Sequence, residues 1–214
     1  MNPFPLVLSA PSGSGKTTIA KRLMQRRSDI GYSVSCTTRA PRAGEEAGTD
    51  YLFLSDMEFI ARRDRGEFAE WATVHGRMYG TLKNAVQKVL DDGLHVMMDI
   101  DVQGAAQFSV AYPNTVLIFI LPPSVEVLVE RLQERQTEDR ATLLTRLKSA
   151  RTELHAVDRY QYVVVNDDLE TAVDRVSSIV DAEEVKRNRV RALDAQVDGL
   201  IARLEQEITS YTNA

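Results

Sequence analysis

The stretch Ala10-Pro11-Ser12-Gly13-Ser14-Gly15-Lys16-Thr17 decides the fold. A short apolar run, residues 6–8, precedes it, and residues 19–27 after it carry the apolar spacing of a helix. A glycine-rich loop between a strand and a helix is the context in which this pattern predicts phosphate binding. A glycine- and serine-rich turn with an incidental lysine is the plain alternative, and the flanking strand and helix argue against it.

Each part of the loop has a separate task. Gly13 and Gly15 allow positive φ and a close approach of the backbone to an anion, which the N–H groups of the helix N-terminus also attract. Lys16 brings a mobile charge to the outer phosphates, and the Thr17 hydroxyl suits Mg²⁺. Ala10 stands where the pattern has glycine, and we treat this as a minor deviation because the residue is also small.

The composition is that of an ordinary folded protein with an acidic surplus. The 214 residues are 43% hydrophobic and 27% charged, which allows one large α/β domain or a core with a small inserted domain. The net charge of -5 argues against a general nucleic-acid-binding protein. Cys36 is the only cysteine, so an intramolecular disulfide is excluded and a reducing compartment is expected.

We expect neither a targeting segment nor a membrane span. Residues 1–5 lack the basic and apolar parts of a signal peptide, and the longest apolar run, residues 116–121, is far too short to cross a bilayer. His75, His95 and His155 have no metal-ligand spacing, so we expect surface or hydrogen-bonded core histidines. The sequence thus predicts a cytoplasmic protein without a membrane partner.

Apolar runs that alternate with helical segments predict a parallel sheet with helices on its faces. Buried strands are expected at 95–101, 115–121 and 162–165, and helices at 81–92 and onward from Ser124 and Leu169. The region 34–93 interrupts this order and reads as a small inserted domain. Its predicted elements are strands at 32–36, 51–54 and 68–74, a turn at 76–80, and a helix to Arg65 opened by the capping box of Ser55 and Glu58.

The C-terminal tail carries its own apolar pattern. Val190, Leu193, Val197, Leu200 and Leu204 are separated by steps of 3, 4, 3 and 4, which is heptad spacing. Two interpretations stay open. The tail is either an amphipathic helix packed on its own core or a helix through which two copies associate.

Three groups of charged or polar side chains add to the phosphate-binding loop. Asp99 and Asp101, two apart at the end of a strand, would share one face at the carboxyl edge of the sheet, where a carboxylate can hold Mg²⁺. A second group suits a phosphate monoester and consists of Arg39, Arg42, Tyr51 and Tyr79. A third group suits a lid that closes over transferring phosphates and consists of Arg131, Arg135 and Arg146. Ordinary solvated surfaces are the alternative for both arginine groups.

Four segments, 32–42, 66–71, 99–105 and 163–168, resemble the guanylate kinase family. They read Tyr-Ser-Val-Ser-Cys-Thr-Thr-Arg-Ala-Pro-Arg, Gly-Glu-Phe-Ala-Glu-Trp, Asp-Ile-Asp-Val-Gln-Gly-Ala and Val-Val-Val-Asn-Asp-Asp. The resemblance runs from about residue 5 to 182. It implies an α/β P-loop kinase: a parallel-sheet core flanked by helices (1–33, 94–124 and 158–185), an inserted GMP-binding domain (34–93) and a helical lid (125–157). Residues 186–214 would form a C-terminal helical extension.

The same resemblance implies a reaction and a set of residues. The enzyme would transfer the γ-phosphoryl group of ATP to GMP, and also to dGMP, with Mg²⁺ held by Thr17 and Asp99, partly through water. The residues implied at the ATP site are Ala10, Pro11, Ser12, Gly13, Ser14, Gly15, Lys16, Thr17, Thr18 and Asn166. Arg39, Arg42, Tyr51 and Tyr79 would bind the GMP phosphate, Ser35, Glu70, Thr81 and Asp101 would read guanine, and Asp99 would lie near the metal and phosphates. The catalytic set would be Lys16, Arg39, Arg131, Arg135 and Arg146.

Two departures from the family pattern and two rival functions accompany this resemblance. The family often has Asn-Tyr where this chain has Arg77-Met78, and Arg-Gly-Thr where this chain has Arg135-Gln136-Thr137. One rival is a kinase of the same fold that phosphorylates another acceptor, such as a phosphorylated ribose. The other is a non-catalytic module of the same fold that binds proteins, and the presence of Lys16 and the arginines argues against it.

Overall fold

A five-stranded, fully parallel sheet forms the core of the molecule. The computed structural model describes residues 2–42, 44–74, 76–134 and 140–212. The strands of the core sheet lie side by side in the order β2 (Ile30–Tyr32), β7 (His95–Asp99), β1 (Pro5–Ser9), β8 (Val116–Leu121) and β9 (Tyr162–Val165). This sheet, with its flanking helices, confirms the predicted α/β fold class.

Helices cover both faces of the core sheet. Leu6 and Leu8 of β1 pack against α1 (Lys16–Arg26) and α7 (Leu169–Glu184) on one face. Val7, between them, points to the other face, where it packs with Val86 of α3 (Lys83–Asp91) and Phe108 of α4 (Val102–Ala111). Strands buried on both faces read as continuous apolar runs, which is why 116–121 could be recognised. The prediction of a buried strand at 162–165 is wrong in its burial, because β9 is at the edge of the sheet and leaves Val163 and Val165 exposed.

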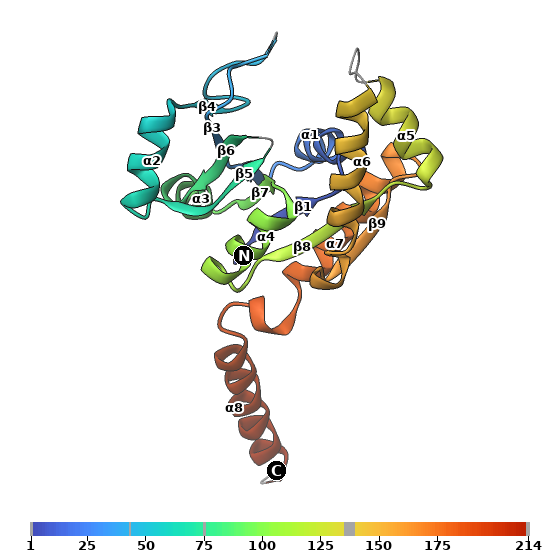
Figure 1. Ribbon diagram of the computed structural model, residues 1–214. Helices are drawn as coiled ribbons and strands as arrows, with labels where there is room; N and C mark the ends of the chain where they lie inside the picture. Colours follow the sequence, from blue (N-terminus) through green and yellow to red (C-terminus); the bar gives the residue numbers. More distant parts are fainter. Residues whose placement is uncertain (1, 43, 75, 135–139, 213–214) are drawn as a thin grey trace.

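A second, four-stranded sheet stands apart from the core sheet (Figure 1). Its strands run in the order β4 (Leu52–Phe53), β3 (Cys36–Thr37), β6 (Arg77–Leu82) and β5 (Phe68–Val74). α2 (Asp56–Asp64) contributes Phe59 to a small core with Cys36, Phe68 and Leu82. The Ser55 hydroxyl accepts a hydrogen bond from the Glu58 N–H at 3.1 Å, which confirms the predicted helix cap.

Two predictions in this region are wrong for reasons of tertiary structure. The strand expected at 32–36 is two strands, because Tyr32 pairs with β7 in the core sheet and Cys36 pairs with Gly80 in the second sheet. The chain passes from one sheet to the other between them. The turn expected at 76–80 is mostly strand β6, in which Gly80 is buried against the Phe68 ring. A glycine that makes room for a neighbour was mistaken for one that permits a turn.

Other boundaries move by a few residues. The helix expected at 81–92 begins at Lys83, because Thr81 still belongs to β6. The strand expected at 95–101 ends at Asp99, and α4 begins at Val102.

A helical hairpin of α5 (Val125–Glu134) and α6 (Arg140–Leu154) faces the second sheet from the opposite side of the molecule (Figure 1). Leu128 and Leu132 of α5 pack with Ala150 of α6 in a separate apolar cluster. Ser124 caps α5, since its hydroxyl accepts a hydrogen bond from the Val127 N–H at 3.3 Å. A short 3-10 helix, η1 (Val157–Arg159), then leads to β9. Arg135 lies outside the described residues.

The C-terminal helix α8 (Leu193–Thr212) extends away from the rest of the molecule (Figure 1). The interpretation that it packs on its own core is wrong, because none of its described residues is buried. Its apolar side chains lie 42% to 64% exposed at Val197, Leu200, Ile201, Leu204 and Ile208.

The base of α8 is fixed by polar contacts. Beside η2 (Arg187–Arg189), Arg189 donates to Glu183 at 3.0 Å and lies 4.3 Å from the centroid of the Phe4 ring. None of the described helices combines the length and the apolar composition needed to cross a membrane.

Candidate active site

The loop between β1 and α1 has the backbone of an anion-binding cradle. Gly13 and Gly15 have φ of 91° and 84°, in the region that side chains disfavour, and Gly15 is the N-cap of α1. No acidic residue lies in the first turn of α1, so the N–H groups and the helix dipole face an anion without competition from that turn. This is the conformation predicted for residues 10–17.

The side chains of Lys16 and Thr17 meet the carboxylate of Asp99 at the end of β7. Lys16 Nζ lies 2.5 Å from Asp99 Oδ1, and the Thr17 hydroxyl donates to Asp99 Oδ2 at 2.5 Å. Lys16 Nζ also donates to the carbonyl of Ile100 at 3.0 Å. A hydroxyl and a carboxylate beside a phosphate cradle are the hard oxygen donors that Mg²⁺ prefers. These residues therefore fit a magnesium ion that bridges to phosphate.

Asn166, from the loop after β9, is hydrogen-bonded to the phosphate-binding loop. Its side-chain amide donates to the Ser14 carbonyl at 2.7 Å, and the residue is buried. A Cβ on Gly15 would lie 2.4 Å from Asn166 Nδ2, so glycine is required here for space as well as for φ. The sequence-based role of Asn166 near adenine stays a prediction.

Two arginines of the α5 and α6 helices extend toward the phosphate-binding loop, one of them to the loop itself and the other to Asn166. Arg146 of α6 donates to the Ser12 hydroxyl at 2.9 Å, and Arg131 of α5 donates to the Asn166 carbonyl at 3.4 Å. Glu153, also on α6, accepts a hydrogen bond from the Ser12 N–H at 3.2 Å. The structure thus brings Arg146 to the cradle and Arg131 to Asn166 beside it, and it does not describe Arg135.

A buried carboxylate lies on the other side of the site. Glu70 of β5 pairs with Thr81 of β6, and the Thr81 hydroxyl donates to Glu70 Oε1 at 2.6 Å. Glu70 is 4% exposed, and this burial raises the pKa of its carboxyl to about 7, with a further contribution from the charge of Asp101. Ser35, also buried, precedes Cys36, which pairs with the neighbour of Thr81. The structure therefore brings Glu70 and Thr81 into contact and places Ser35 directly before β3, the strand beside β6.

Asp101 does not share a strand face with Asp99. It is the N-cap of α4, and its Oδ1 accepts hydrogen bonds from the N–H groups of Gln103 at 2.7 Å and Gly104 at 2.9 Å. The prediction from strand periodicity is wrong because β7 ends two residues earlier.

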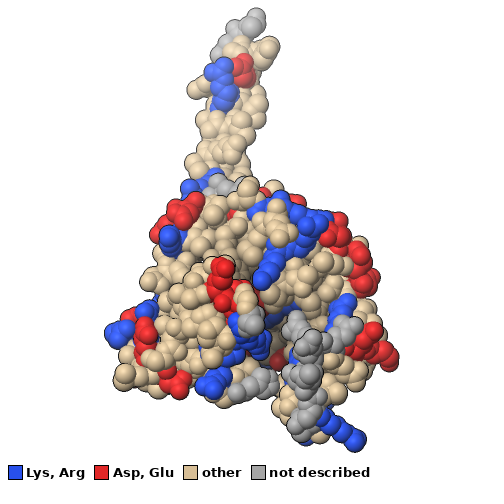
Figure 2. All heavy atoms as spheres, turned by 90° about the horizontal axis from the view of Figure 1, so that it is seen from above, with Lys and Arg blue, Asp and Glu red and all other residues tan. Residues whose placement is uncertain are grey.

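Three of the four residues expected to bind a phosphate monoester, Arg39, Tyr51 and Tyr79, form a third group, and the Arg42 side chain is exposed. The Arg39 guanidinium lies 5.4 Å from the Tyr51 ring centroid, and the Tyr51 and Tyr79 rings are 6.1 Å apart. Burial raises the pKa of Tyr51 to about 12, so its hydroxyl remains a hydrogen-bond donor near neutral pH. The face seen from above in Figure 2 is hollowed near its centre, and Lys and Arg side chains border the hollow.

Glu45 forms an ion pair with Arg39 that sequence reasoning missed. Its two oxygens accept from Arg39 Nη2 at 2.8 Å and Nη1 at 3.0 Å, and one of them also accepts from the Arg42 N–H at 2.8 Å. The Arg39 guanidinium lowers the pKa of the Glu45 carboxyl. The only signal in the sequence was an acid six residues after Arg39 in a glycine-containing loop.

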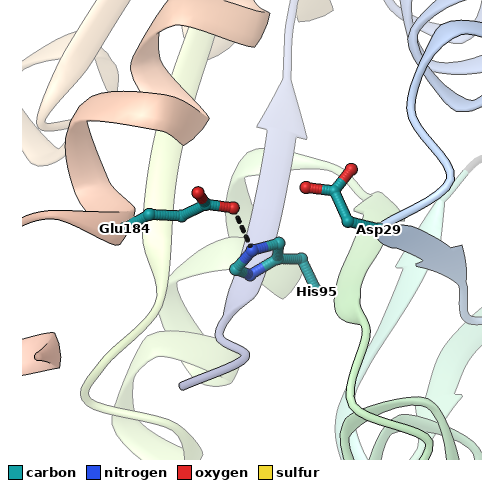
Figure 3. A group of neighbouring side chains, drawn as sticks. All are labelled: Asp29, His95 and Glu184. Atoms are coloured by element: carbon teal, nitrogen blue, oxygen red, sulfur yellow. Dashed lines mark hydrogen bonds and ion pairs between the residues drawn. The ribbon is translucent and has the colours of Figure 1, made fainter. Parts of the chain in front are cut away.

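A second group of titratable side chains lies away from this site (Figure 3). His95 accepts a hydrogen bond from the Phe4 N–H at its Nδ1 and contacts Glu184 at 2.9 Å through Nε2. Arg27 contacts both Asp29, at 2.6 Å, and Glu184, at 3.4 Å. Because both ring nitrogens and both carboxylates have partners, the group is a structural contact, and His95 is the hydrogen-bonded core histidine that was predicted.

Comparisons with known proteins agree with this geometry. The family model described as guanylate kinase matches residues 2–183. The guanylate kinase of Thermotoga maritima is 48% identical over 183 residues, which are 86% of this chain and 88% of the relative. That of Myxococcus xanthus is 45% identical over 186 residues, 86% of this chain and 89% of the relative. The crystal structure of guanylate kinase from Anaplasma phagocytophilum aligns with a TM-score of 0.77 at 36% identity, covering 92% of this chain and 94% of that one.

A phosphate cradle on a parallel sheet, a lysine with a hydroxyl and a carboxylate beside it, and a separate group of arginine and tyrosine side chains define a P-loop nucleotide kinase. Within that class, the chain belongs to the guanylate kinase family. The family match ends at residue 183, so α8 lies beyond it.

Proposed function

We propose that this enzyme transfers the γ-phosphoryl group of ATP to the phosphate of GMP, giving ADP and GDP. The buried carboxylate of Glu70, held by Thr81 on the acceptor side of the site, is the observation that carries this assignment. Guanine offers N1–H and its 2-amino group as adjacent donors, and a carboxylate accepts both. Adenine has an acceptor at N1 and no 2-amino group, so it would leave the buried carboxylate unpaired.

The donor nucleotide would bind at residues 10–17. The loop N–H groups and Lys16 would hold its phosphates, and Thr17 and Asp99 would hold Mg²⁺, partly through water. The ion would supply charge neutralisation for the outer phosphates. The acceptor phosphate is already ionised at neutral pH, so we assign no general base.

Positioning and charge neutralisation would supply the rate enhancement. Arg39, with Tyr51 and Tyr79, would orient the acceptor phosphate. To do so, the Arg39 guanidinium would have to give up its ion pair with Glu45 and bind the phosphate instead. Arg146 contacts the loop at Ser12, Arg131 contacts Asn166 beside it, and both would neutralise the transferring group. Roles for Arg42, whose side chain is exposed, and for Arg135 rest on the family resemblance alone.

An acceptor assay tests this function. Phosphate transfer from ATP to GMP, dGMP, AMP and ribose bisphosphate is measured side by side. We expect GMP and dGMP to be accepted, because the assigned residues contact base and phosphate and not the 2′-hydroxyl. AMP should be slower by on the order of 10⁴-fold in kcat/KM. Equal use of AMP, or a preference for ribose bisphosphate, would remove the assignment, and the absence of any transfer would favour the protein-binding module.

We also propose that α8 joins two copies of the chain. Its apolar residues Leu193, Val197, Leu200, Leu204, Ile208 and Tyr211 form one stripe with a spacing close to 3.6 residues. Polar side chains flank the stripe unequally. Asp198 and Glu205 lie on one flank, and Arg203, which forms an ion pair with Glu207 at 2.8 Å, lies on the other.

A membrane surface fits this helix poorly as a partner. An amphipathic helix that binds anionic lipid carries Lys and Arg on its polar face, whereas α8 carries Asp194, Asp198, Glu205 and Glu207 against Arg203. The ion pair of Arg189 with Glu183 joins η2, the short helix before α8, to the end of α7.

Light scattering on the full chain tests the association. We expect a dimer mass for the parent and for Ala202→Glu, which adds a charge opposite the stripe. Leu204→Glu should have half that mass, and a chain ending at Arg191 should have the mass of its own monomer. A monomeric parent would refute the proposal. We further propose a cytoplasmic location, where ATP and GMP are available and a free Cys36 is stable.

A further inference from the structure

The carboxylate of Glu70 rests on the first turn of α4, directly over Gly104. A Cβ placed on Gly104 would lie 2.5 Å from Glu70 Oε2 and 3.1 Å from its Cδ. Real Cβ contacts are essentially never as short as 2.5 Å, so one of the two groups would have to move. The carboxylate of Glu70, on β5, occupies the space that a side chain at position 104 of α4 would fill.

The carboxylate has little freedom to move away. The Thr81 hydroxyl donates to Oε1 at 2.6 Å, and Glu70 is buried. A shift of the carboxylate would break this hydrogen bond where water cannot replace it. Gly104 itself is held as well, because its N–H donates to Asp101 Oδ1 at 2.9 Å at the start of α4.

The backbone of α4 does not require glycine at this position. Gly104 lies in the third position of the helix, outside the positive-φ region that favours glycine. Glycine inside a helix is unfavourable compared with alanine. Glycine at position 104 is therefore explained by the room it leaves for the Glu70 carboxylate and not by its backbone conformation.

We infer that Gly104 is the positioning residue for the guanine-reading carboxylate: its missing side chain sets where Glu70 presents its oxygens to the acceptor base. The inference rests on the proposed function. A methyl group here would push the carboxylate by about 1 Å, and a displacement of that size costs about 10²-fold in catalytic efficiency. The loss should appear in the use of GMP and leave the use of ATP unchanged.

The test is a double-mutant cycle in the full enzyme. Gly104→Ala should lower kcat/KM for GMP by about 10²-fold, mainly through KM, with KM for ATP within about twofold of the parent. In the background of Glu70→Asp, whose shorter side chain withdraws the carboxylate from α4, the same Gly104→Ala change should cost less than about threefold. Gly199→Ala is the matched control, because Gly199 also lies in a helix and a Cβ there meets no atom within 4 Å.

Three outcomes would overturn the inference. They are an unchanged kcat/KM for GMP in Gly104→Ala, an equal rise in KM for GMP and ATP, and an equal cost of the methyl group in both backgrounds. Failure of the proposed function is distinct, because it appears in the parent enzyme as the absence of a preference for GMP over AMP.

Discussion

The donor and acceptor halves of the active site are built in different ways. The donor half is one contiguous loop, residues 10–17, whose backbone forms the cradle and whose Lys16 and Thr17 add the side-chain groups. The acceptor half gathers side chains from β5 and β6, from the loops between residues 35 and 51 and from the N-cap of α4, and three of them are already held by protein partners. Glu45 holds Arg39, Thr81 holds Glu70, and α4 engages Asp101 as its cap.

This difference separates two ways of recognising a nucleotide. Backbone N–H groups attract any phosphate, so the donor half binds strongly and selects weakly. Buried side chains select one base because a wrong base leaves them without partners, and the protein bears the cost of burying them. Substitutions in the donor half should therefore change rate, and substitutions in the acceptor half should change specificity and the response to pH.

Lys16→Met should give the largest effect. It removes the mobile charge at the transferring phosphates, so kcat should fall on the order of 10³-fold, while KM for GMP stays within about threefold. Steady-state kinetics with each substrate varied in turn would measure this. Lys88→Met, at an exposed position of α3, is the control and should be neutral. Undiminished turnover would remove the lysine from the mechanism, and a parallel rise in KM for GMP would show that the two halves are not separable.

Glu70→Gln should have a smaller effect that falls on the acceptor alone. A glutamine can accept only one of the two guanine N–H donors and presents its own amide N–H to the other, so kcat/KM for GMP at pH 8 should fall about 10²-fold. KM for ATP should be unchanged. Loss of ATP binding in this variant would contradict a division between the halves.

The pH profile of the parent should carry the signature of Glu70. Its carboxyl has a pKa of about 7, and only the ionised form accepts both guanine donors, so kcat/KM for GMP should rise with pH and level off above about 7. The Glu70→Gln profile should lack this rise. Titration of the GMP phosphate is common to both enzymes, so the ratio of the two profiles isolates the side chain.

The sequence predicted the donor half well because its information is local. Loop, lysine and hydroxyl are neighbours in the chain, and the cradle follows from their order. The core strands were found for a similar reason, since strands buried on both faces are continuous apolar runs.

The acceptor half depends on contacts between residues far apart in sequence. Gly80 was taken for a turn because nothing near it in the chain shows the Phe68 ring that it accommodates. Asp101 was assigned to a strand face because its role as a cap depends on β7 ending at Asp99. Glu45 and Gly104 were missed altogether, since their importance comes from Arg39 and Glu70. The family resemblance identified Glu70, Thr81 and Ser35, whereas propensity and spacing alone would not have found them.

The smallest effect should be on stability, and it follows from the cost of burying Glu70. Its carboxyl has a pKa of about 7 when folded and an ordinary value of 4.5 when exposed. Between these values the folded protein holds one more proton than the unfolded chain, so the free energy of unfolding falls as pH rises from 4.5 to 7 and stays lower above it. The difference in pKa corresponds to a loss of about 3 kcal/mol above pH 7.

Glu70→Gln removes this titration and can keep the hydrogen bond from Thr81. Relative to the parent, the variant should therefore gain about 1 to 2 kcal/mol in the free energy of unfolding at pH 8, less than the full amount because its amide N–H groups also need partners. The gain should shrink as the pH falls and approach zero below pH 4.5, where the parent carboxyl is protonated in both states. Urea denaturation of both proteins at pH 5 and pH 8 would measure the difference. A gain of equal size at both pH values would mean that packing, and not the buried charge, separates them, and that the acceptor half bears no electrostatic cost for its selectivity.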